Sequence, residues 1–146
     1  ATYFTIKAPD FDGTLAMKGG EAIKKRFIEV KELGNEAAPK DQNMQAHLET
    51  AYEMYCRGYT FYPVDLKKSS GTHYTVEDGG LRIPLSGLPG LPASAAEAIY
   101  KGRQDEEYSS VDDLRKRGGA TKSIIEVLRN NGVLVGLPES AQIEFF

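Results

Sequence analysis

The sequence has no tryptophan, one cysteine and two histidines among its 146 residues. The single cysteine, Cys56, cannot form an internal disulfide, which fits a reducing cytoplasm. No zinc site and no other metal site is expected, because the spacing of cysteine and histidine ligands that zinc requires is absent. Two roles for the thiol stay open: a hydrolytic nucleophile paired with His47 or His73, or a buried structural thiol near a helix end. The second interpretation is preferred.

Long apolar runs and an excess of positive charge are missing as well. No stretch of about 18 apolar residues exists, so no membrane span or membrane partner is expected. The opening residues, ATYFTIKAPDFD, lack the basic and apolar regions of a secretory signal. They also lack an initiator methionine, and we therefore expect the chain to be part of a larger protein. The formal charge of −3 gives no overall positive field that would attract nucleic acid.

The first half of the chain predicts two helices and a small β-hairpin. Apolar residues recur at helical spacing over 20–33, and again from Met44 to Tyr55. The residues between Gly58 and Leu85 are rich in β-branched and aromatic side chains, with a turn at Asp78-Gly79-Gly80. This part therefore predicts a mixed α/β unit that ends near residues 80–85.

The second half predicts short helices separated by tight turns, over 93–104, 110–117 and 121–130. Ser94 and Glu97 have the spacing of a capping box, and Thr121 is placed to cap the last helix. The expected fold class is α+β, mostly helical, with the β-hairpin between two helical regions.

The stretch from Leu85 to Arg103 predicts a helix, an apolar turn and a second helix. Gly90 lies in the turn between Leu88 and Leu91, which we expect to anchor it in the core. A glycine turn at a helix start presents unpaired N–H groups and the positive end of the helix dipole to an anion. The candidate binding residues are Gly90, Leu91, Ala93 and Ser94.

This stretch resembles the helix-hairpin-helix motif of DNA polymerases, ligases and repair proteins. The resemblance implies binding to the phosphate backbone of duplex DNA without base preference. Where the family usually has a second glycine, this chain has Pro92, which lacks an N–H donor but suits a helix start. A plain helical corner without a ligand is the alternative interpretation.

The stretch GGATKSIIEVLRNNG looks like a second, degenerate copy of the motif, with Thr121, Lys122 and Ser123 at its helix start. Lys101, on the first helix, completes the set of predicted DNA-binding residues. Between Gly87 and Asn130 there are as many acidic as basic residues. Binding must therefore depend on local placement, and we expect it to be weak and sensitive to salt.

The sequence ends in QIEFF, which resembles the pentapeptide that binds the bacterial sliding clamp. That resemblance implies clamp contacts by Gln142, Ile143, Phe145 and Phe146, with Phe145 where leucine is more common. Folding of the two phenylalanines onto the core of this protein is the alternative.

In their order, these segments resemble the C-terminal end of the PolC-type DNA polymerase III α subunits of low-GC Gram-positive bacteria. The resemblance implies a fingers fragment over 1–82, a tandem helix-hairpin-helix domain over 83–136 and a flexible clamp-binding tail over 137–146. It implies three partners: duplex DNA, the sliding clamp (β subunit) and the remainder of the polymerase chain. The catalytic carboxylates and their Mg²⁺ ions would lie in the palm, outside this sequence. We therefore assign no catalytic residue and no cofactor to this chain; the competing hypothesis is a helical protein-docking module that does not bind DNA.

Overall fold

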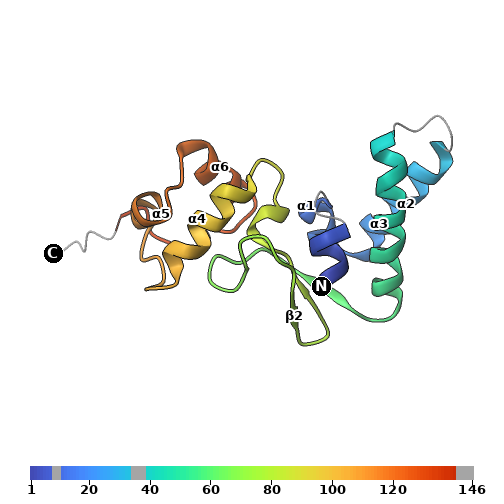
Figure 1. Ribbon diagram of the computed structural model, residues 1–146, viewed down its shortest axis with the longest axis horizontal. Coiled ribbons are helices and arrows are strands. Elements are labelled where there is room, and N and C mark those ends of the chain that lie inside the picture. Colours follow the sequence, from blue (N-terminus) through green and yellow to red (C-terminus); the bar gives the residue numbers. More distant parts are fainter. Residues whose placement is uncertain (8–10, 34–38, 141–146) are drawn as a thin grey trace.

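The computed structural model describes residues 1–7, 11–33 and 39–140 (Figure 1). A helical pair lies at one end of the molecule, a small sheet in the middle and a group of short helices at the other end. The pair consists of α2 (Gly20–Leu33) and α3 (Pro39–Cys56), preceded by a π-helix (Tyr3–Lys7) and by α1 (Gly13–Met17). The predicted helix over 20–33 and the predicted α+β class are confirmed.

The sheet has three short strands in the order β1-β3-β2. β2 (Thr75–Glu77) and β3 (Gly80–Arg82) are antiparallel, and Asp78-Gly79 forms the turn between them, as predicted. β1 (Thr60–Tyr62) pairs with β3 in parallel, which the sequence did not predict. Parallel pairing joins distant segments through a long connection, so no local turn signal announces it.

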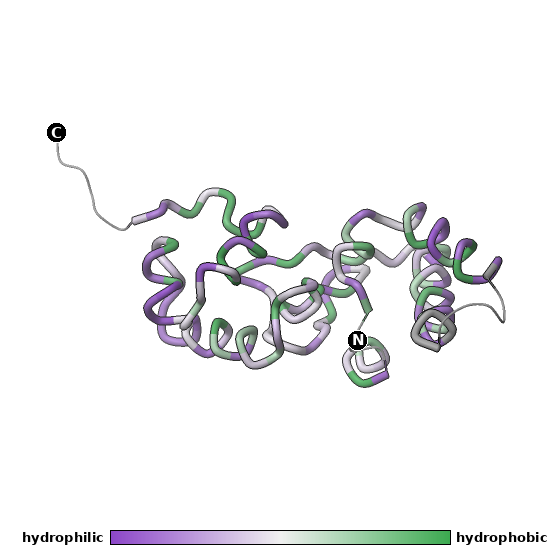
Figure 2. The backbone as a smooth tube through the Cα atoms, turned by 90° about the horizontal axis from the view of Figure 1, so that it is seen from above, coloured by the Kyte–Doolittle hydropathy of each residue, from purple (hydrophilic) through white to green (hydrophobic). Residues whose placement is uncertain are grey.

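The second half contains a 3₁₀ helix, η3 (Leu85–Gly87), followed by α4 (Ala93–Arg103), α5 (Val111–Arg117) and α6 (Lys122–Asn130). The predicted helices over 93–104, 110–117 and 121–130 are thus present to within one residue at each end. The leftmost helix in Figure 2, α5, is hydrophilic over most of its length, in keeping with its sequence VDDLRKR.

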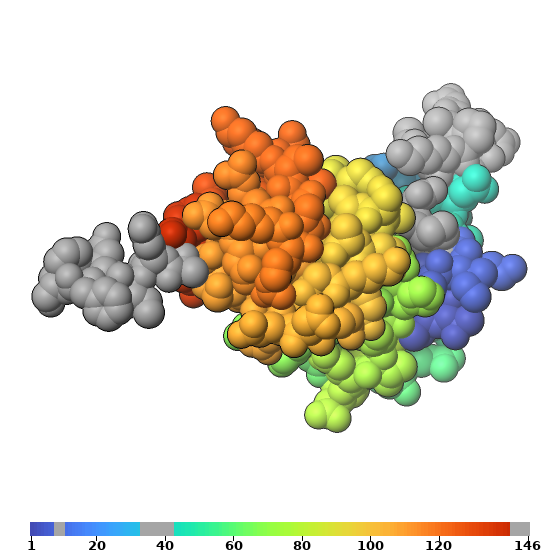
Figure 3. Space-filling view, turned by 60° about the vertical axis from the view of Figure 1, so that its left-hand side comes forward, coloured from blue at the N-terminus to red at the C-terminus, as the bar shows by residue number. Residues whose placement is uncertain are grey.

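One hydrophobic cluster joins the two halves of the chain, from Phe4 in the π-helix to Leu134 after α6. At the junction, the backbones of α1 and η3 touch: a Cβ on Gly13 would lie 2.6 Å from the carbonyl oxygen of Gly87. Figure 3 shows the space-filling surface of η3 and α4 continuing without a break into that of α5 and α6. The turns that precede α4 and α6 therefore belong to one continuous helical body.

Cys56 does not form the buried structural thiol that the sequence suggested. It is the last residue of α3, and its side chain is exposed. The buried residues of α3, Leu48 and Ala51, lie one to two turns before Cys56, which is exposed at the end of the helix. Helical periodicity places Cys56 on the same stripe as Leu48 and Tyr52, but it does not show that the core stops before the end of the helix.

Candidate nucleic-acid interface

The first turn, between η3 and α4, has the anchoring that the sequence predicted. Leu88 and Leu91 are 1% and 4% exposed, and between them Gly90 adopts the left-handed conformation with φ +90°. Only glycine takes this conformation at little cost. Burying each leucine stabilises the turn by about 1.5–3 kcal/mol, so its backbone is held firmly at the surface.

The helix that follows this turn begins without a side-chain cap. Its N-cap residue is Pro92, and no side chain in the described part of the chain accepts a hydrogen bond from the first-turn N–H groups. Ala93 and Ser94 lie exposed in that first turn. Four N–H groups at a helix start have no partner within the helix, and they carry the positive end of its dipole. This end of α4 can therefore accept an anion.

Two details differ from the sequence interpretation. The N–H of Leu91 donates to the carbonyl of Leu88 at 3.1 Å, so this candidate donor is used within the turn. The capping box is wrong: Glu97 does not cap α4 but accepts a hydrogen bond from the hydroxyl of Thr72 at 3.0 Å. That contact joins residues far apart in the sequence, so spacing within the helix could not indicate it.

The second turn, between α5 and α6, repeats this geometry. Gly119 is left-handed with φ +64°, Ala120 is buried, and Thr121 is the extended N-cap of α6. The Thr121 hydroxyl accepts a hydrogen bond from the N–H of Ile124 at 3.4 Å. Lys122 and Ser123 follow at the exposed first turn of α6. The structure thus brings the three predicted residues of the second copy together.

The two turns align position by position at one constant offset. Gly119, Ala120 and Thr121 follow the order of Gly90, Leu91 and Pro92. The same offset relates the buried residues of the flanking helices, in the pairs Leu85 and Leu114, Ala96 and Ile125, and Ile99 and Leu128. The chain therefore contains a tandem repeat of helix, glycine turn and helix.

Lys101 is not at either turn. It lies in the last turn of α4, which begins at Ala93, and a rise of 1.5 Å per residue puts it about 12 Å along the helix axis from the first turn. A phosphate held at Gly90 would therefore be out of its direct reach.

The basic residues of this region divide into two groups by their contacts. Arg103 donates to the carbonyls of Leu66 and Ser69 at 2.9 and 2.7 Å. These contacts join α4 to the loop that contains Leu66 and Ser69. Arg129 pairs with Glu139 at 2.6 Å. Four other bases are exposed and form no ion pair with any described residue: Lys101, Arg115, Lys116 and Lys122.

Arg115 and Lys116 were not proposed as binding residues from the sequence. They lie in the last turn of α5, directly before the second glycine turn. The basic run Arg115-Lys116-Arg117 is visible in the sequence. The run does not show which of these side chains are held by contacts within the protein and which are available to a ligand. The contacts of Arg117 make that distinction.

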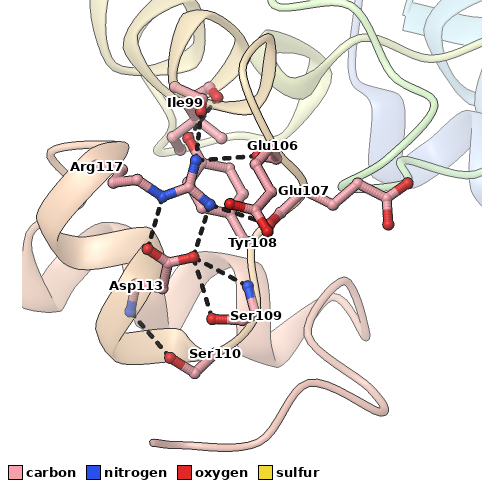
Figure 4. Close-up of polar contacts among 9 residues, drawn as sticks. Ile99, Glu106, Glu107, Tyr108, Ser109, Ser110, Asp113 and Arg117 are labelled. Carbon is pink, nitrogen blue, oxygen red and sulfur yellow. Dashed lines mark hydrogen bonds and ion pairs between the residues drawn. The ribbon is translucent and has the colours of Figure 1, made fainter. Parts of the chain in front are cut away.

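Arg117 lies at the centre of a polar network at the end of α5 (Figure 4). Its Nε and Nη2 donate to the two carboxylate oxygens of Asp113, each at 2.6 Å. The hydrogen bond from Arg117, followed by one from the N–H of Ser109, holds the pKa of Asp113 well below its usual range. The same pairing raises the pKa of Arg117. Both groups therefore remain ionised at neutral pH.

The beginning of the segment expected to be a flexible tail lies against α5. The N–H groups of Val111 and Asp112 donate to the carbonyls of Pro138 and Glu139 at 2.8 and 3.0 Å. The first N–H groups of α5 thus already bind backbone carbonyls of this chain, unlike the N–H groups at the starts of α4 and α6 in the described part of the chain. The predicted clamp contacts at Gln142, Ile143, Phe145 and Phe146 lie outside the described residues.

Two further properties of the described residues bear on other functional classes. Over residues 1–7, 11–33 and 39–140, no group of three or more His, Cys, Asp or Glu side chains is placed to hold a metal ion. No helix in the described part of the chain is both long and apolar enough to cross a membrane.

Comparison with known proteins gives two concordant results. A family model described as the helix-hairpin-helix motif matches residues 58–142, more than half of the chain. The chain is also 44% identical over 145 residues to a PolC-type DNA polymerase III of Clostridium perfringens, and 43% and 40% identical over its full length to those of Thermotoga maritima and Bacillus subtilis.

The share of each relative that is covered is small. The matches take in 99–100% of this chain but only 10–11% of each polymerase. The resemblance to PolC-type polymerases that the sequence motifs indicated is confirmed.

Proposed function

Because the chain belongs to the helix-hairpin-helix motif family, we propose that it is the duplex-binding part of a PolC-type DNA polymerase III. One observation carries the proposal: two aligned turns each place a left-handed glycine and an exposed helix start above buried anchors. Such a pair can hold two phosphates of a DNA backbone through N–H groups that do not read bases.

The contacts at the two turns would differ in kind. At the first turn, the available groups are the backbone N–H groups of Gly90, Ala93 and Ser94, with Leu91 fixing the loop. At the second turn, Lys122 adds a full positive charge to the helix start, next to the hydroxyls of Thr121 and Ser123. Arg115 and Lys116 would add attraction at the same end, and Lys101 would act at longer range along α4.

Binding through so few phosphates is weak and depends on salt. Neutralising about two to four phosphates gives a slope of roughly −2 to −4 in log affinity against log salt. Non-specific protein–DNA binding typically has a Kd of about 10⁻⁴–10⁻⁶ M at physiological salt. A module of this strength becomes useful when further contacts of the same assembly act together with it.

The sequence QIEFF at 142–146 is proposed as one such further contact, made with the sliding clamp. Burial of Ile143, Phe145 and Phe146 in an apolar pocket would gain about 5–8 kcal/mol, before the costs of ordering and association are subtracted. Clamp and DNA binding would then strengthen one another because both partners lie on the same assembly.

Fluorescence anisotropy with a labelled duplex of arbitrary sequence tests the DNA part. The 146-residue chain is titrated at 50 and 150 mM NaCl and against a second duplex of unrelated sequence. We expect similar affinities for the two duplexes and a clear loss at the higher salt. Absence of binding at 50 mM NaCl would leave the protein-docking hypothesis as the better explanation.

Titration of purified bacterial sliding clamp tests the second contact. The intact chain is compared with one that ends at Ala141, and each is also checked by thermal unfolding. We expect truncation to abolish clamp binding while the unfolding temperature and the duplex affinity stay the same. A lowered unfolding temperature with no clamp binding by either chain would assign the two phenylalanines to the core.

A further inference from the structure

The tandem repeat contains one position at which the two turns are anchored by opposite chemistry. Leu88, at the start of the first turn, is 1% exposed and anchors it by apolar burial. The constant offset between the repeats puts Arg117 at the equivalent position before the second turn. A charged side chain therefore occupies the place of a core leucine, and it needs another means of holding its turn.

The Arg117 side chain uses all five of its N–H donors within the protein. Two go to Asp113, one turn earlier on α5. The other three go to backbone carbonyls at the end of α4 and in the loop after it: Gly102, Glu106 and Glu107, at 2.9, 2.9 and 3.0 Å. In Figure 4 the guanidinium lies between α5 and this loop, with acceptors on both sides. The side chain thus ties the helix after the first turn to the helix before the second.

The backbones of α4 and α5 pack closely at this junction. A Cβ on Gly102 would lie 2.3 Å from the hydroxyl of Tyr108 and 2.8 Å from the carbonyl oxygen of Arg117. Tyr108 is itself fixed, because its hydroxyl donates to the carbonyl of Ile99 at 2.6 Å and its ring lies under the guanidinium at 4.8 Å. The α4–α5 contact is therefore backbone against backbone, held by Arg117 and Tyr108.

The first turn also rests on the second repeat. A Cβ on Gly90 would lie 3.3 Å from the Cγ2 of Val127 on α6, the helix that the second turn begins. The two repeats are thus linked twice, by direct packing at Gly90 before the start of α4 and by the Arg117 junction at the end of α4. Any change in the α4–α5 angle alters the spacing of the two helix starts.

From these contacts we propose that Arg117 is a positioning residue: it fixes the spacing of the two glycine turns so that both can engage one duplex. This inference rests on the proposed function and adds to it a residue that does not touch DNA. Because every donor of Arg117 is used internally, its positive charge serves the junction rather than a phosphate. Lysine keeps that charge but has three donors and no planar fork, so it cannot reproduce the five contacts.

The spacing itself can be measured without DNA. Cys56 is exposed and is replaced by serine, and cysteines that carry spin labels are placed at Ser94 and Ser123, in the first turns of α4 and α6. Pulsed electron paramagnetic resonance then gives the distribution of distances between the labels. We expect one narrow distribution in the otherwise unchanged chain and a broad or shifted one in Arg117→Lys. A narrow, unshifted distribution in both Arg117→Lys and Arg117→Gln would overturn the proposal.

A double-mutant cycle measures the consequence for binding. In the unchanged chain, Lys122→Glu should weaken duplex binding about 5-fold, because it reverses a charge at the second turn. In the Arg117→Lys background, which alone should lose about 3- to 10-fold, the same change should add less than 2-fold. Multiplication of the two effects would overturn the proposal, since it would mean that the second turn still engages normally.

Arg57→Lys is the matched control. Arg57 pairs with Glu53 on the surface near the end of α3, far from the turns in the sequence, and the substitution is chemically the same. It should leave both the distance distribution and the duplex affinity unchanged, and a change in either would overturn the assignment to Arg117. If the unchanged chain fails to bind duplex at all, the proposed function fails, whereas the distance measurement still decides whether Arg117 sets the spacing.

Discussion

Arg117 and Asp113 form a two-pronged ion pair one turn apart on α5, with both N–O distances at 2.6 Å. Pairs of this spacing on an exposed helix contribute only about 0.3–0.5 kcal/mol. This pair differs because the same guanidinium also binds three backbone carbonyls, and because its side chains are only 31% and 21% exposed. The role of this pair is therefore structural. Lys122 is then the basic residue that remains available at the start of α6.

Asp113→Asn should lower the free energy of unfolding at pH 7 by about 1 kcal/mol, the upper end of the range for exposed pairs. The pKa of Asp113 is lower in the folded chain than its unfolded value of about 4. Its contribution is therefore complete above about pH 4 and is lost as the pH falls through the unfolded value toward the folded one. Urea unfolding at pH 7 and pH 3 should show the gap between the two proteins closing in acid.

The adjacent Asp112→Asn is the control for that measurement. Asp112 is exposed at the same helix start and forms no ion pair with a described residue, so its effect should stay within about 0.5 kcal/mol. An equal effect from both substitutions would assign the stabilisation to the helix dipole instead of to Arg117.

Gly90→Glu should weaken duplex binding, and Gly90→Ala separates the two causes of that loss. Both substitutions place a side chain at φ +90° and near Val127, which costs about 1–2 kcal/mol of stability. Only glutamate adds a negative charge at the proposed phosphate site. Anisotropy titration should therefore show a larger loss for glutamate than for alanine, with the two variants similarly destabilised. Equal affinities of the two variants would count against the first turn as a phosphate site.

Gly102→Ala tests the backbone contact between α4 and α5 by the sign of its effect. In an unobstructed helix this change stabilises by about 0.5–1 kcal/mol. Here the added methyl group meets the Tyr108 hydroxyl and the Arg117 carbonyl, so we expect a loss of about 1–3 kcal/mol in urea unfolding. Ala98→Gly, at an exposed position of the same helix, measures only the difference in helix propensity between alanine and glycine. It should cost about 1 kcal/mol. A stabilised Gly102→Ala protein would show that the helices can separate easily.

Tyr74→Phe should be neutral or should raise the free energy of unfolding by up to about 1 kcal/mol. The Tyr74 hydroxyl is buried without a hydrogen-bond partner among the described residues, and burial raises its pKa well above the usual value. Removing an unsatisfied buried hydroxyl relieves its desolvation cost. Tyr108→Phe is the opposite case, since it loses a 2.6 Å hydrogen bond to Ile99 and should cost about 1 kcal/mol. A destabilised Tyr74→Phe protein would show that the hydroxyl has a partner.

The sequence by itself determined the local elements of the candidate site. Gly90 and Gly119 mark left-handed turns because other residues rarely adopt that conformation. Ser110 and Thr121 mark helix starts because their hydroxyls accept hydrogen bonds from N–H groups only three residues ahead. The Asp78-Gly79 hairpin turn belongs to the same class. Each of these features is decided by interactions within a few residues, so spacing and residue type are enough to find it.

Tertiary structure alone decided which of the charged and polar side chains are bound within the protein and which remain available to a ligand. Arg103 and Lys101 are two positions apart, yet one is bound to a distant loop and the other forms no ion pair with a described residue. Glu97 is bound to Thr72 instead of capping α4, and Arg117 replaces a core leucine by a network of hydrogen bonds. The parallel pairing of β1 with β3 is of the same kind. These contacts join segments far apart in the chain, and their energies depend on three-dimensional proximity that no local pattern records.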